Sequence, residues 1–128
     1  MEVEQQVCSL DLAKRLEELG VKQDSLFYWS WMVHQHEDCA GVFFGQKRPS
    51  NGVYIHYSAF TVAELGEMLK CTFHVDQPTR AGMVKMGAGN WHTWINHPDK
   101  KLQSFKGTEA DARAKMLIYL IENNLLTL

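Results

Sequence analysis

Apolar residues recur at helical spacing in three segments of the chain. In the first segment, charged residues separate Leu12, Leu16 and Leu19, which predicts an amphipathic helix from residue 9 to residue 19. The second segment covers residues 62–69, and the third and longest covers residues 109–122. Each of these helices is expected to bury one side against another element.

Two of the expected helices begin with a capping-box pattern. In this pattern a hydroxyl residue is followed three residues later by a side chain that can return the hydrogen bond, as Thr61 is followed by Glu64 and Thr108 by Asp111. Gly66 stands inside the second helix, where it costs about 1 kcal/mol relative to alanine. Gly66 therefore indicates either the close approach of another element or a short helix that is held by packing.

Segments rich in aromatic and β-branched residues lie between the helices, and these segments are expected to be strands. The expected strands cover residues 26–33, 42–44, 53–57, 83–86, 91–95 and 101–105. Both faces of the first of them are largely apolar, which favours a central position in a sheet. Short links join the last three, which predicts that they form a meander.

The order of the expected elements is helix, three strands, helix, three strands, helix. This order predicts an α+β fold with one antiparallel sheet of about five to six strands and three helices packed mainly on one face. A length of 128 residues fits a single globular domain over residues 1–128.

Composition and charge then narrow the class of protein. Hydrophobic residues make up 45% of the chain and charged residues 22%, which is typical of globular domains in solution. No apolar run approaches the ~18 residues of a membrane span, and the first residues lack the pattern of a signal peptide. The net charge of −2 argues against a strongly basic nucleic-acid binder. We therefore expect a cytoplasmic protein without membrane contact, its three cysteines reduced.

Three segments of the chain resemble small uncharacterised proteins of phages and prophages, namely residues 8–29, 57–69 and 108–123. The last segment is similar to the C-terminal helix of such proteins. The resemblance implies a viral or mobile-element origin, and hence the cytoplasm of a bacterium or of an infected host cell. No activity is attached to that group, so the resemblance implies no catalytic residue.

Histidines and cysteines gather in two places that could supply zinc ligands. His34, His36 and Cys39 lie within six residues of one another. Cys71 and His74 follow the second expected helix. Tetrahedral zinc takes four nitrogen or sulfur ligands, so these residues are the candidates for a zinc site or for a metal-dependent enzyme. Their spacing matches no familiar zinc module, and surface histidines with small core thiols are the simpler interpretation.

A second group of candidates consists of residues that could contact a partner protein. Trp91 and Trp94 are three positions apart in an expected strand, so they should lie on opposite faces, with one of them outside the core. The chain ends in an apolar tail with Leu125, Leu126 and Leu128, which is either docked on the core or engaged with a partner. A homodimer formed through this tail or through an exposed strand is one form of such contact.

A third group is basic and brackets the middle strands. Its members are Arg48, Arg80, Lys85, Lys100 and Lys101. Together with the strand tryptophans they are candidates for contacting nucleic acid. No pattern in the chain identifies a nucleophile or an acid–base pair, so no catalytic residue is named. The sequence favours a non-enzymatic accessory protein of phage type, regulatory or counter-defence, that acts by protein–protein interaction. A zinc protein and a nucleic-acid binder are the alternatives.

Overall fold

The computed structural model describes residues 2–45, 53–70, 80–85, 90–96 and 102–126, with Lys70, Asn96 and residues 80–85 described by their backbone alone. The helices are α1 (Val3–Gln6), α2 (Leu10–Glu18), the 3-10 helix η1 (Glu37–Cys39), α3 (Val62–Lys70) and α4 (Glu109–Glu122). The strands are β1 (Phe27–Met32), β2 (Gly41–Phe44), β3 (Tyr54–Ser58), β4 (Arg80–Lys85), β5 (Trp91–Asn96) and β6 (Gln103–Gly107). In the described part of the chain, no helix has both the length and the apolar character needed to cross a membrane.

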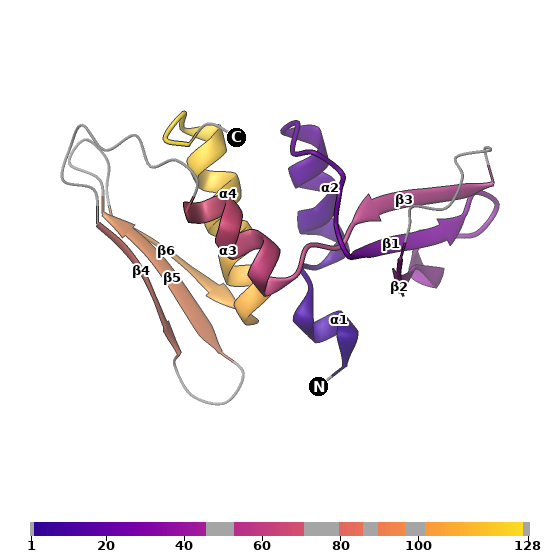
Figure 1. Cartoon of the computed structure of the whole chain (residues 1–128), viewed down its shortest axis with the longest axis horizontal. Coiled ribbons are helices and arrows are strands. Elements are labelled where there is room, and N and C mark those ends of the chain that lie inside the picture. The colour runs from indigo at the N-terminus through magenta and orange to yellow at the C-terminus, as the bar shows by residue number, and fades with distance from the viewer. Residues whose placement is uncertain (1, 46–52, 71–79, 86–89, 97–101, 127–128) are drawn as a thin grey trace.

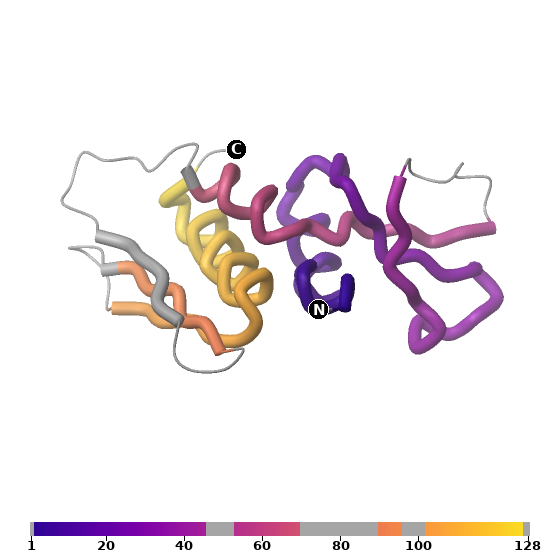
Figure 2. The backbone as a smooth tube through the Cα atoms, turned by 60° about the horizontal axis from the view of Figure 1, so that its bottom comes forward, coloured from indigo at the N-terminus to yellow at the C-terminus, as the bar shows by residue number. Residues whose placement is uncertain are grey.

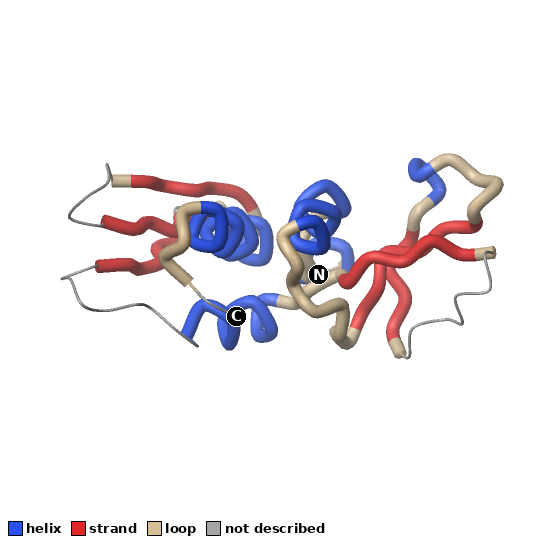
Figure 3. Tube along the Cα trace, turned by 90° about the horizontal axis from the view of Figure 1, so that it is seen from above, coloured by secondary structure: helices blue, strands red, loops and turns tan. Residues whose placement is uncertain are grey.

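The strands form two three-stranded antiparallel sheets, one in the order β2-β1-β3 and the other in the order β4-β5-β6. The two sheets lie at opposite ends of an elongated molecule, and α2, α3 and α4 lie between them (Figure 1). The tube views from two further directions give the same arrangement (Figures 2 and 3). The central position of β1 and the meander of β4, β5 and β6 are as the sequence predicted.

The predicted α+β class is confirmed, but the single sheet of five to six strands is not what the described residues form. Every strand pairs only with strands of its own half of the chain, and α3 separates the two groups in sequence. The helices consequently lie between two sheets instead of covering one face of a single layer (Figure 3). A pattern of apolar positions identifies strands but does not say which groups of strands share hydrogen bonds.

The hydrophobic core lies where the three long helices meet the sheet of β4, β5 and β6. Its fully buried large side chains include Leu16, Phe60, Leu65, Leu117 and Leu120. The buried alanines of α4 allow close packing of this helix. One of them, Ala112, accepts a hydrogen bond through its carbonyl from the hydroxyl of Thr93 on β5, at 2.8 Å.

The sheet of β1, β2 and β3 joins this core through its tryptophans. The Trp29 indole donates to the carbonyl of Cys8 at 2.9 Å, and the Trp31 ring stacks on Tyr57 with 5.9 Å between ring centroids. The Lys14 ammonium on α2 lies 5.7 Å from the centre of the Trp31 ring and forms an ion pair with Glu37. The hydrogen bond from Lys14 holds the pKa of the Glu37 carboxyl below its usual value. These contacts fix the sheet against α2.

The first predicted capping box is confirmed in full and the second in part. Glu64 N donates to the Thr61 hydroxyl at 3.2 Å, and Thr61 N donates to the Glu64 carboxylate at 3.0 Å. At α4, Asp111 N donates to the Thr108 hydroxyl at 3.1 Å. The Asp111 carboxylate accepts a hydrogen bond from Ser9 N at 2.7 Å instead of returning to Thr108. Asp111 therefore links the N-terminal ends of α2 and α4.

Gly66 is a point of close approach, which was one of the two interpretations of its position inside a helix. A Cβ atom at this residue would collide with Nη1 of the Arg113 guanidinium. Arg113 also donates to the Glu109 carboxylate at 3.1 Å and to the Val62 carbonyl at 3.4 Å. A side chain at position 66 would require the end of the Arg113 side chain to move away from this arrangement between α3 and α4.

Substitutions at Gly66 and Arg113 are expected to be strongly coupled. In the native background Gly66→Ala should lower the free energy of unfolding by about 1 kcal/mol, because displacement of Arg113 from its acceptors outweighs the gain in helix propensity. In an Arg113→Ala background the same change should raise it by about 1 kcal/mol. A double-mutant cycle measured by urea denaturation tests this expectation, and equal effects of Gly66→Ala in both backgrounds would contradict it.

Candidate functional site

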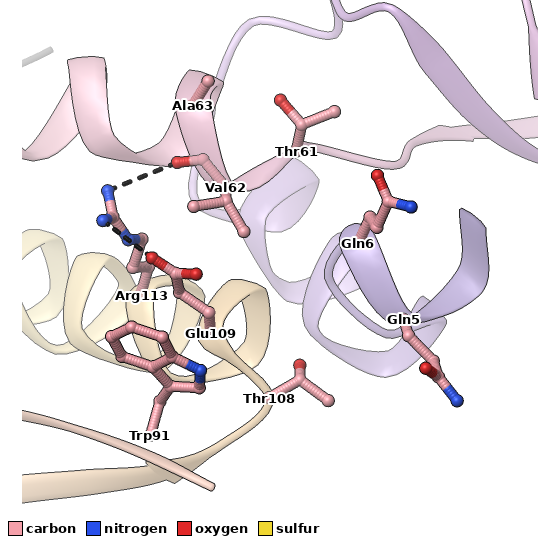
Figure 4. Close-up of a pocket in the computed structure, with 9 residues that line it drawn as sticks. All are labelled: Gln5, Gln6, Thr61, Val62, Ala63, Trp91, Thr108, Glu109 and Arg113. Carbon is pink, nitrogen blue, oxygen red and sulfur yellow. Dashed lines mark hydrogen bonds and ion pairs between the residues drawn. The ribbon is translucent and has the colours of Figure 1, made fainter. Parts of the chain in front are cut away.

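A cavity of about 730 Å³ lies where the N-terminal ends of α3 and α4 come together beside α1 and the start of β5 (Figure 4). Its lining residues are Gln5, Gln6, Thr61, Val62, Ala63, Trp91, Thr108, Glu109 and Arg113. Pockets of ~300–1,000 Å³ are typical of small-molecule sites. The cavity is therefore large enough for an organic ligand.

The two threonines of the cavity are held by the caps of their helices. Each hydroxyl oxygen accepts from the backbone at the start of a helix, Thr61 from Glu64 N and Thr108 from Asp111 N. A hydroxyl that accepts in this way still has its own hydrogen to donate. An antiparallel bridge between Val7 and Thr61 places α1 alongside the start of α3, which brings the glutamines of α1 to the opposite wall.

Two of the residues that line the cavity form a compensated ion pair. Nη2 of Arg113 donates to Oε1 of Glu109 at 3.1 Å, and the two side chains are only 20% and 28% exposed. Figure 4 shows that the second carboxylate oxygen of Glu109 lies on the side away from Arg113. The pair therefore adds no net charge but presents one acceptor to a ligand.

Trp91 forms a wall of the cavity. It is the first residue of β5 and shares a face of that strand with Thr93 and Ile95, which are both buried against the helices. In Figure 4 the indole lies beside Glu109 and Arg113. Cysteine, histidine, serine and lysine are not among the described residues that line the cavity. Its walls offer an aromatic surface and hydrogen bonds, which suit binding.

A second feature is the outer edge of the sheet of β1, β2 and β3, called here the β2 edge and defined by Val42, Phe43 and Phe44. Gly45 N donates to the Leu26 carbonyl at 3.1 Å, which sets the alternation of hydrogen bonds between β1 and β2. In this alternation the backbone groups of Phe43 face β1, and those of Val42 and Phe44 face outward. The side chain of Phe44 is 76% exposed and that of Phe43 is 44% exposed.

The described residues do not gather the predicted zinc ligands. His34, His36 and Cys39 are exposed in the segment between β1 and β2. Nδ1 of His36 accepts a hydrogen bond from Asp38 N at 3.2 Å. Within the described ranges, no group of three or more histidine, cysteine or acidic side chains could hold a metal ion. Cys71 and His74 lie outside the described residues, so the zinc site stays a prediction.

The predicted partner-binding residues occupy different surroundings. Trp91 lines the cavity, whereas Trp94 lies on the opposite face of β5. Leu126 is only 5% exposed and Leu125 packs against the core, so this part of the tail contacts the chain itself. Leu128 lies outside the described residues.

The predicted nucleic-acid contacts are largely outside what the structure describes. Arg80 and Lys85 begin and end β4, where the structure gives the backbone alone. Arg48, Lys100 and Lys101 lie outside the described residues. A nucleic-acid site made by these side chains therefore stays a prediction.

Sequence reasoning missed most of the cavity and of the β2 edge. Of the cavity residues it named only Trp91 as a candidate, although the capping threonines and Gly66 did indicate the local structure around it. Glu109 and Arg113 are an ordinary pair at i and i+4 on a helix, and nothing in the sequence distinguishes them. Neither a protein-family model, nor a curated protein, nor a solved structure matches this chain, so its function has to be inferred from the cavity and the β2 edge.

Proposed function

We propose that this chain is a non-enzymatic accessory protein that binds an extended apolar segment of another protein along the β2 edge. The observation that carries the proposal is the exposure of Phe44 on an edge strand whose outward backbone groups belong to Val42 and Phe44. A peptide added antiparallel to β2 would exchange hydrogen bonds with these groups. The sheet would then gain a fourth strand.

The composition of β2 also supports the proposal. Natural proteins usually protect exposed edge strands with lysine, proline or a bulge, because an open apolar edge promotes aggregation. The residues of β2 are Gly-Val-Phe-Phe, which include none of these protecting types. An edge of this kind is expected when a partner strand covers it.

The side chains around the edge favour a protein segment over nucleic acid. Phe43 and Phe44 project on opposite faces of β2, so alternate side chains of an added strand would each meet an aromatic ring. Phe27 lies on the same face of the sheet as Phe44, and the two rings are in contact, with 5.4 Å between ring centroids. The exposed Asp38 lies three residues before the start of β2, and its carboxylate would repel phosphates.

The biological setting rests on the resemblance in sequence. A phage-type accessory role, regulatory or counter-defence, is compatible with a protein that acts by binding a partner. That setting and the cytoplasmic location stay predictions. A homodimer through β2 is the alternative occupant of the same edge.

Peptides selected for binding to the whole chain are expected to contact the β2 edge. The probe is a random-peptide display library screened on the immobilised native chain. Selected peptides should carry alternating apolar residues, and Phe44→Lys should weaken their binding by about tenfold or more, because truncating an aromatic contact costs ~2 kcal/mol. Binding should also slow hydrogen exchange at the amides of Val42 and Phe44, which face outward.

The matched control is Leu102→Lys, which places the same charge at a 63% exposed leucine just before β6, in the other sheet. This variant should bind the peptides as the native chain does. Peptides that bind both lysine variants equally, or a library that yields no binder, would refute the proposal. A dimer of the native chain that Phe44→Lys dissociates in sedimentation equilibrium would assign the edge to a second copy and refute a separate partner.

A further inference from the structure

The cavity between α1, α3, α4 and β5 is independent of the β2 edge and shares no residue with it. Its apolar walls are the indole of Trp91 and the side chain of Val62, which Figure 4 shows projecting toward the cavity from α3. A flat ring can stack on an indole, and base–aromatic stacking contributes ~1–3 kcal/mol. The shape of this wall therefore suits a planar ligand.

The polar groups of the cavity both donate and accept hydrogen bonds. A hydroxyl group can both donate and accept, which applies to Thr61 and Thr108, and a side-chain amide can do the same, which applies to Gln5 and Gln6. A ligand matched to this lining has donors and acceptors side by side on its edge. Simple hydrocarbon rings lack such groups and would form no hydrogen bonds with this lining.

The charge of the cavity points to a neutral ligand. Its only charged lining residues are Glu109 and Arg113, among the described residues, and they pair with each other at 3.1 Å. A ligand with a full negative charge would approach the free oxygen of Glu109, and a full positive charge would compete with Arg113. A ring N–H or an exocyclic amine can instead donate to that oxygen while the ion pair stays intact.

We propose that this cavity binds a neutral planar heteroaromatic ring with hydrogen-bond donors and acceptors on its edge, the chemistry of a nucleobase. Trp91 stacks on the ring, Glu109 accepts from a ring or amine N–H, and Thr61, Thr108 and Gln6 complete the edge contacts. Such a ring reaches the cavity either in a free nucleoside or as an unstacked base of a single strand. Both sources present the same chemistry to these residues.

Titration of the native chain with adenosine tests the proposal. The readout is the indole N–H resonances in NMR spectra, with the Trp91 resonance assigned from a Trp91→Leu variant. Adenosine should shift the Trp91 resonance saturably, and ribose, which has no ring to stack, should not. Trp91→Leu should weaken binding of adenosine by about tenfold or more, measured by calorimetry. Trp94→Leu is the matched control on the opposite face of the same strand and should leave binding unchanged.

A second variant guards against a folding defect in Trp91→Leu. Val62→Phe enlarges an inward-facing side chain without removing a polar contact, and it should also weaken binding by about tenfold or more. Short single-stranded oligonucleotides form the other arm of the experiment. Tighter and salt-dependent binding of oligonucleotides would identify a strand as the source, and equal binding would identify a free nucleoside. Absence of saturable binding in both arms, or equal loss in Trp94→Leu, would overturn the proposal.

Discussion

Phe60→Ala is expected to lower the free energy of unfolding by about 3–5 kcal/mol, because it opens a large cavity in the middle of the core. The Phe60 side chain is fully buried at the junction of β3 and α3, among residues of α2 and α4. Its backbone carbonyl accepts from Cys8 N at 3.0 Å, a hydrogen bond that the substitution keeps. The measured loss therefore reports the side chain. Urea denaturation followed by tryptophan fluorescence gives the free energy.

The matched control for this prediction is Phe44→Ala, which removes the same ring from an exposed position. That change should alter the free energy of unfolding by less than about 0.5 kcal/mol. A loss below about 1 kcal/mol for Phe60→Ala would mean that the ring is not central to the core.

The second large effect is expected at alkaline pH and arises from Cys8. Burial of the thiol raises the pKa of Cys8 from 9.0 to about 12, and the nearby carboxylates of Asp111 and Glu64 add to the rise. Between these values the folded chain keeps the proton that the unfolded chain loses. The contribution of the Cys8 thiol to the free energy of unfolding is therefore complete below pH 9 and declines as the pH rises toward 12. At a pH of about 10.5, the free energy of unfolding should have fallen by about 2 kcal/mol through this thiol alone.

The Cys8→Ala variant isolates this effect, since the other groups that titrate above pH 9 are common to both proteins. The difference in unfolding free energy between the native chain and Cys8→Ala should shift by about 2 kcal/mol between neutral pH and a pH of about 10.5. A constant difference for Cys8→Ala would contradict the raised pKa of the thiol.

The local structure of this chain was predictable because its signals lie within a few residues of one another. The apolar spacing of Leu12, Leu16 and Leu19 identified α2, and the pair of Thr61 and Glu64 identified the start of α3. Gly66 indicated a close approach even though its neighbour, Arg113, is 47 positions away in the sequence. In each case the residues of one short segment are enough to predict the local structure of that segment.

The assembly of these elements was not predictable from the same signals. Whether the two groups of strands join depends on contacts between distant segments, such as the hydrogen bond from Ser9 N to Asp111. The same is true of the cavity, because its walls come from both ends and the middle of the chain. The exposure of Phe44 follows from the position of β2 at an edge, which the apolar run at residues 42–44 does not specify.

The position of the helices between the two sheets has a consequence for how the sequence of this protein can evolve. Helix faces are common recognition surfaces, but here the apolar faces of α2 and α4 are buried in the core. Strand edges and helix ends are then the places where a substitution can alter specificity at little cost in stability. Divergence among related chains should accordingly concentrate at those termini and margins.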